Sequence, residues 1–172
     1  MTKVVINGGH YVGADPGALG SKTTEAEVTF DLMGRVAAYL ETAGCEVLTV
    51  HKSELADICT TANKWGSDLF VSIHCNAANG KARGTETFAY YGSNAGDALA
   101  HHIQSQIVAS IGTVDRGVKE AGFYVLKHTN CPAVLVECAF IDNVYDEALL
   151  IEREDDFARA IARGVTDYIT RK

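Results

Sequence analysis

Short apolar runs alternate with amphipathic segments along the first half of the chain, and this alternation is what most constrains the fold. The runs at residues 3–7, 46–50 and 68–73 are rich in Val and Ile, which is typical of buried strands. Between them, residues 25–43 and 53–65 carry apolar side chains at helical spacing. Strands and helices that alternate in this way form a mostly parallel sheet, so we expect an α/β fold.

The second half of the chain continues the pattern. We expect a strand at residues 85–91, a helix at 94–111, a strand at 133–140 and a last helix at 155–168. No internal repeat or linker interrupts the 172 residues, and 47% of them are hydrophobic, which is enough to build a core. The sequence therefore predicts one domain over residues 1–172, with a twisted, mostly parallel sheet flanked by helices on both faces.

The charge pattern excludes two classes of partner. Fifteen Lys and Arg against twenty-two Asp and Glu give a net charge of −7, and both signs are scattered along the chain. We therefore expect no nucleic-acid partner, because such proteins gather basic residues on one face. No run of about 18 apolar residues is present, so we expect no membrane insertion. We also expect a monomer.

The five cysteines form an odd set without a CxxC pair. This pattern gives no support to a cysteine-based zinc site and indicates free thiols made in a reducing compartment. The cysteines are Cys45, Cys59, Cys75, Cys131 and Cys138.

Three titratable side chains stand at the ends of predicted strands. His10 follows the first strand through two glycines, His74 follows the run DLFVSI, and Glu137 follows AVLV. Ligands of α/β sheets bind at the carboxyl ends of the strands, so we expect these groups to share one site. Two histidines and a carboxylate are a common catalytic zinc set, and Glu25 at the start of its helix could supply that carboxylate. On the residues alone, hydrogen-bonded structural histidines remain the alternative.

Four segments, in order, carry a family resemblance: GGHYVGADPGALG, TTEAEVTFDL, DLFVSIHCNAA and DRGVKEAGFYVLKHTNCPAVLVECAFIDN. They resemble the motifs of the zinc-dependent N-acetylmuramoyl-L-alanine amidases, the amidase-3 type of peptidoglycan hydrolase, over essentially the whole chain. The resemblance implies that His10, Glu25 and His74 hold Zn²⁺ and that Glu137 is the catalytic glutamate. It also implies a peptidoglycan substrate, cut at the amide between N-acetylmuramic acid and L-alanine.

Several neighbouring residues are alternatives at the site. Glu27 lies two positions after Glu25, and residues so spaced on a helix face different sides, so only one of them can point inward. The family resemblance, together with this geometry, favours Glu25. Strand alternation turns Cys75 and Cys138 into the core. We assign no role to His51, His101 and His102, expect His128 on the surface, and leave open whether Asn76, Arg116 and Lys119 contact a substrate carboxylate or glycan.

Two other functions remain possible at this level. A zinc hydrolase of another amide substrate would keep the same scaffold and ligands, whereas a non-catalytic wall-binding module would be expected to lack a ligand or the glutamate. The first residues, MTKVVINGGH, lack the apolar stretch of a secretory signal. We therefore expect cytoplasmic synthesis and action on the cell wall after release by lysis, as for phage enzymes, or as a domain of a longer exported protein.

Overall fold

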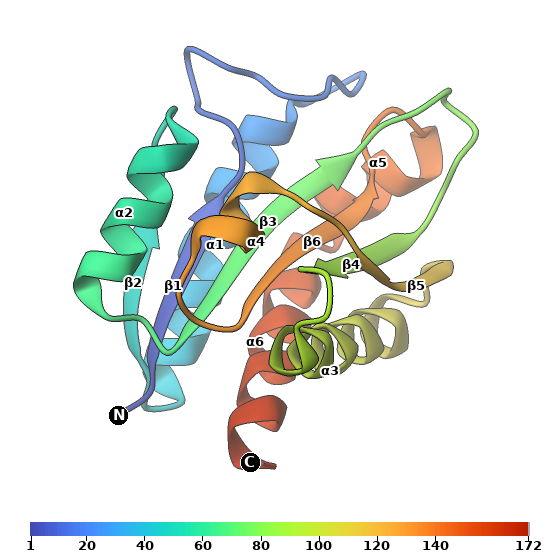
Figure 1. Cartoon of the computed structure of the whole chain (residues 1–172). Helices are drawn as coiled ribbons and strands as arrows, with labels where there is room; N and C mark the ends of the chain where they lie inside the picture. The colour runs from blue at the N-terminus through green and yellow to red at the C-terminus, as the bar shows by residue number, and fades with distance from the viewer. Residues whose placement is uncertain (172) are drawn as a thin grey trace.

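Six strands form one sheet in the computed structural model, which describes residues 1–171. They are β1 (Lys3–Gly8), β2 (Glu46–Val50), β3 (Leu69–Asn76), β4 (Thr85–Ala89), β5 (Asp115–Glu120) and β6 (Ala133–Phe140). Their spatial order is β2-β1-β3-β6-β4-β5 (Figure 1). All neighbouring strands are parallel except β4 and β6, which are antiparallel. The expected mostly parallel sheet is confirmed.

Helices cover both faces of this sheet. They are α1 (Glu25–Thr42), α2 (Leu55–Trp65), α3 (Asn94–Ile111), α4 (Tyr124–His128), α5 (Val144–Glu152) and α6 (Glu154–Thr170). Leu32, Ile103 and Phe157 of α1, α3 and α6 pack on one face with Val71 of β3. On the other face, α2 and α4 pack against a smaller core that contains Phe70 of β3. The two cores complete a single α/β domain, as expected.

The start of α1 is fixed by a capping box. The Thr24 side chain accepts a hydrogen bond from the Glu27 backbone N–H, and the Glu27 side chain accepts one from the Thr24 N–H. Glu27 is exposed at this cap, whereas Glu25 is buried. Capping residues of this kind satisfy N–H groups that the helix leaves unpaired. The local structure thus turns Glu25 inward and leaves Glu27 outside the site.

Three elements were not predicted, and each lacks a strong local pattern. Strand β5 is an edge strand of sequence DRGVKE, without an apolar run. Helix α4 has five residues, and α5 is separated from α6 by Arg153 alone. Helix α2 begins two residues later than the expected 53–65, with Glu54 at its N-cap and no side-chain hydrogen bond there.

Within residues 1–171, no helix combines the length and the apolar composition that crossing a bilayer requires.

The packing of α3 against α6 generates a stability prediction. A Cβ built on Gly164 of α6 would lie 2.5 Å from the Ile103 Cα, so Gly164→Ala must push the two helices apart. We expect a loss of about 1–3 kcal/mol in the free energy of unfolding. Gly34→Ala on α1, where nothing lies within 4 Å of the added Cβ, should instead stabilise by about 0.5–1 kcal/mol. Urea denaturation measures both, and equal stability of the two variants would contradict this packing.

Candidate active site

Three predicted ligands meet at the carboxyl ends of β1 and β3. His10 lies just beyond β1, Glu25 opens α1, and His74 lies within β3. One possible ligand atom from each lies within 4.8 Å of the others. The Glu25 carboxylate bridges the two rings, with Oε2 3.1 Å from His10 Nε2 and Oε1 2.9 Å from His74 Nδ1. The fold therefore brings the expected donor set together.

Backbone groups hold the Glu25 carboxylate in place. The Ala18 N–H donates to Oε2 at 2.8 Å, and the Cys75 N–H donates to Oε1 at 3.0 Å. Burial opposes ionisation of Glu25, but hydrogen bonds from His10 and His74 outweigh it and hold the pKa of its carboxyl well below the ordinary value. Glu25 is thus a buried, ionised group between two imidazoles.

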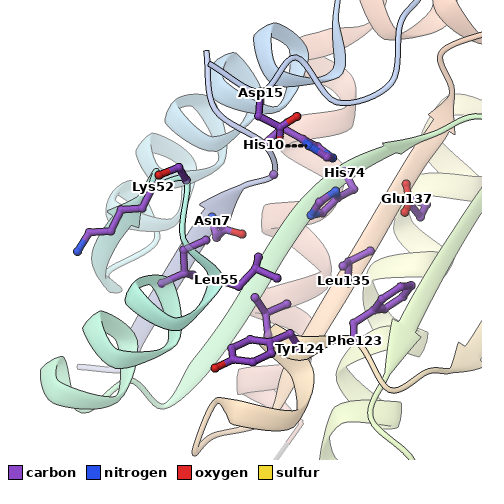
Figure 2. Close-up of a pocket in the computed structure, with 14 residues that line it drawn as sticks. Asn7, His10, Asp15, Lys52, Leu55, His74, Phe123, Tyr124, Leu135 and Glu137 are labelled. Atoms are coloured by element: carbon purple, nitrogen blue, oxygen red, sulfur yellow. Dashed lines mark hydrogen bonds and ion pairs between the residues drawn. The ribbon is translucent and has the colours of Figure 1, made fainter. Parts of the chain in front are cut away.

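Asp15 orients the His10 ring. Its Oδ2 lies 2.8 Å from His10 Nδ1 (Figure 2). The other ring nitrogen, Nε2, faces Glu25. The hydrogen bond to Glu25 raises the pKa of His10 to about 9, with a further contribution from Asp15, although burial lowers it. A carboxylate on the outer nitrogen of an imidazole is the usual support of a metal-bound histidine. Asp15 therefore completes an arrangement suited to a cation beside Nε2.

Two glycines make room for this cluster. A Cβ on Gly9 would lie 2.3–2.6 Å from atoms of the His74 ring. A Cβ on Gly17 would lie 2.6 Å from both Glu25 Oε2 and the His10 ring. His10 itself has φ 63°, the one positive φ outside glycine among residues 1–171. Such strain in a non-glycine residue is typical of functional sites.

Glu137 lies beside the cluster without belonging to it. On β6 it is in register with His74 of β3, so the two side chains share a face of the sheet. Its Oε2 is buried and has no hydrogen-bond partner among residues 1–171. Burial raises the pKa of Glu137 to about 8, and the charges of Glu25 and Glu86 add to this shift. A carboxyl group with such a pKa can exchange protons near neutral pH.

A pocket of about 420 Å³ opens over these groups (Figure 2). His10, His74 and Glu137 line its polar side. The apolar side comes mainly from α2 and α4 and is lined by Leu55, Ile58, Phe123, Tyr124, Val125 and Leu135. A largely apolar pocket with a few convergent titratable groups is the usual form of an enzyme site.

Glu86 is a buried carboxylate that sequence reasoning missed. It lies opposite Glu137 in the β4–β6 pair and accepts hydrogen bonds from Asn76 Nδ2 at 2.7 Å, Arg116 Nε at 2.9 Å and Lys119 Nζ. Burial opposes its ionisation, but Lys119 and Arg116 lower the pKa of Glu86 below its ordinary value. The three polar candidates thus converge on one carboxylate.

The remaining candidates lie apart from the ligand cluster. Cys75 and Cys138 are buried in the core on the other face, and burial raises the pKa of both thiols. All five cysteines are free. His51 stacks on Tyr11, while His101 and His128 are exposed, as expected for His128. None of these side chains joins the His10, Glu25 and His74 cluster within the described residues.

A histidine-glutamate-histidine cluster at the carboxyl ends of a parallel sheet, with a separate glutamate beside it, defines the class as a hydrolase with a candidate metal site. The family model of the N-acetylmuramoyl-L-alanine amidases, Amidase_3, matches residues 4–167. The chain therefore belongs to this amidase family. The family resemblance of the sequence is confirmed, and the cluster is consistent with the metal site typical of the family.

Individual relatives agree with this assignment. The chain is 38% identical to the N-acetylmuramoyl-L-alanine amidase LytC of Bacillus subtilis, covering 96% of this chain and 35% of LytC. It is 34% identical to an endolysin of Bacillus phage SPP1, covering 100% of this chain and 68% of the endolysin. An amidase crystal structure from Clostridium difficile 630 superposes with a TM-score of 0.94 at 31% identity, covering 99% and 98% of the two chains.

The raised pKa of Glu137 generates a pH-dependent stability prediction for the metal-free protein. Between pH 4.5 and about 8, the folded state keeps this proton while the unfolded state loses it, so stability falls as pH rises. Glu137→Gln removes that loss. With chelator present, we expect the variant to exceed wild type in unfolding free energy by about 1 kcal/mol or more at pH 9, and the gap to close below pH 4.5. Urea denaturation across pH tests this, and identical stability at pH 9 would contradict it.

Proposed function

We propose that this chain is one catalytic domain that hydrolyses the amide bond between N-acetylmuramic acid and L-alanine in peptidoglycan, with Zn²⁺ held by His10, Glu25 and His74. The observation that carries this proposal is the position of Glu137. It lies in register with His74, next to the His10, Glu25 and His74 donor set, with a buried oxygen that has no hydrogen-bond partner among residues 1–171.

The donor set fits zinc. Two imidazole nitrogens and one carboxylate oxygen are the protein ligands of many catalytic zinc sites, which leave a fourth position open. Asp15 on the outer nitrogen of His10 supports this reading, because ligating histidines are oriented in this way. The ionised Glu25 also supplies the negative charge that offsets a divalent cation. When bound, Zn²⁺ would activate the scissile carbonyl and a water molecule as a Lewis acid.

Glu137 would move the protons of the reaction. As general base it takes a proton from the attacking water at its buried oxygen, and as general acid it passes that proton to the departing alanine nitrogen. The water adds to the carbonyl carbon, and the carbon–nitrogen bond then breaks to leave a carboxylate and an amine. A pKa raised by burial suits a group that must both accept and release a proton.

The apolar side of the pocket would hold the substrate and limit access of water. Leu55, Phe123 and Tyr124 face the titratable groups across the cavity. All of the groups named in this reaction come from one chain, so we expect the domain to act as a monomer. A hydrolase of another amide substrate is the alternative, and the products of digestion separate the two.

Metal content tests the ligand assignment. We expect about one zinc per purified chain, and a large loss of zinc in His74→Ala because the two remaining ligands bind it poorly. His101→Ala, which removes an exposed histidine, is the matched control and should keep full content. Elemental analysis measures both, with circular dichroism to confirm folding. Full zinc occupancy in folded His74→Ala would show that the ligand set is wrong.

Activity of Glu137→Gln tests the proton transfer. The variant should keep its zinc, since Glu137 is assigned no metal bond, yet hydrolyse peptidoglycan roughly 10²-fold more slowly or worse. Glu41→Gln, the same change at an exposed position on α1, should retain wild-type turnover. Digestion should release new L-alanine amino termini without new reducing sugar ends. Near-normal turnover of Glu137→Gln, or the appearance of reducing ends, would rule out this mechanism.

A further inference from the structure

A row of titratable side chains crosses the sheet from the histidine cluster to its edge. His74, Glu137 and Glu86 are register partners on the neighbouring strands β3, β6 and β4, so they share one face. The edge strand β5 adds Arg116 and Lys119, both hydrogen-bonded to Glu86. The two cations therefore lie beyond Glu137, on the side away from His10.

The two cations share one carboxylate. Arg116 and Lys119 both hydrogen-bond to Glu86. The two acids of β5 use other partners: Asp115 accepts hydrogen bonds from Gln104 and the Gly117 backbone, and Glu120 accepts one from the Gly92 backbone.

Both side chains keep donors for a second anion. Their exposed fractions are 34% for Arg116 and 41% for Lys119, while Glu86 itself is 7% exposed. Arg116 uses Nε for Glu86 and Nη1 for the Arg83 carbonyl, which leaves Nη2 for a further acceptor. Its guanidinium lies over the Phe140 ring, with Cζ 4.9 Å from the ring centroid. The Lys119 ammonium has three donor hydrogens, of which Glu86 takes one. Carboxylates and phosphates are the anions that such charged donors bind, and a peptide supplies the carboxylate.

The direction of the substrate follows from the role of Glu137. Because Glu137 protonates the departing nitrogen in the proposed function, the peptide must leave the cluster on the Glu137 side. Strand β5 lies two strand spacings beyond β6, a distance of about 10 Å. An extended peptide spans that distance in about three residues. The first residues after the cleaved bond therefore reach Arg116 and Lys119.

We propose that Arg116 and Lys119, positioned by Glu86, form a carboxylate-binding subsite for an acidic peptide on the leaving-group side of the cleaved amide. This inference rests on the proposed function, which sets the direction of the peptide. It adds a substrate preference: stem peptides with free carboxylates bind better than the same peptides with those groups amidated.

Two matched substrates test the subsite with the zinc-loaded protein. Both are muramoyl tripeptides, with every peptide carboxylate either free or converted to a primary amide. For wild type, we expect KM for the acidic substrate to be about 10-fold lower or more, at similar kcat. Arg116→Gln should raise KM for the acidic substrate to that of the amide, and leave the amide substrate unaffected. Arg163→Gln on α6 removes the same charge far from this strand and should preserve the wild-type difference.

Other outcomes would overturn the subsite. Two results would mean that the cations only stabilise the pairing of β5 with β4. One is an equal KM for the two substrates in wild type. The other is an equal rise in KM for both substrates in Arg116→Gln. If Arg116→Gln fails to fold, the salt dependence of KM in wild type provides a second test. Raising ionic strength from about 0.05 to 0.5 M should raise KM for the acidic substrate alone, because salt screens the attraction. Cleavage of neither substrate by wild type would refute the proposed function itself, and the subsite with it.

Discussion

The Glu25 carboxylate is the interaction on which the site depends. It is 3% exposed, and it accepts hydrogen bonds from four separate positions: the rings of His10 and His74 and the backbone of Ala18 and Cys75. A buried carboxylate without such partners would cost several kcal/mol. Its location at the N-terminus of α1 adds the favourable field of the helix. One side chain thus ties the loop after β1, the start of α1 and the end of β3 together.

Two glutamates of the same chain are set to opposite protonation states by their surroundings. Glu25 is buried among donors, so its carboxyl stays ionised and can face a cation. Glu137 is half-buried, and its buried Oε2 has no donor among residues 1–171. It also faces the negative charges of Glu25 and Glu86, so burial and these charges raise its pKa to about 8. Such a separation of pKa values allows two carboxyl groups of one pocket to take different chemical roles.

Most of the fold and the cluster of His10, Glu25 and His74 could be predicted because their signals are local. Val- and Ile-rich runs mark β1 and β3, and polar residues directly after them mark the site. Asp15 and Glu86 were missed for a different reason. Asp15 lies in a loop without periodicity, and its role exists only once the loop folds back on His10. Glu86 is the single charged residue of the strand TETFA. Glu137 is likewise the single charged residue of AVLVECAF, and this pattern could have indicated a buried carboxylate.

Strand direction explains how Glu86 comes to face Glu137. In a fully parallel sheet, only the last residues of each strand reach the carboxyl edge, where ligands bind. Strand β4 runs antiparallel to β6, and β5 is parallel to β4, so the first residues of both strands lie at that same edge. Glu86 and Arg116, each the second residue of its strand, are therefore placed beside the pocket rather than at the opposite end of the sheet. The reversal of two strands extends the functional edge beyond the histidine cluster and gives the site its cationic end.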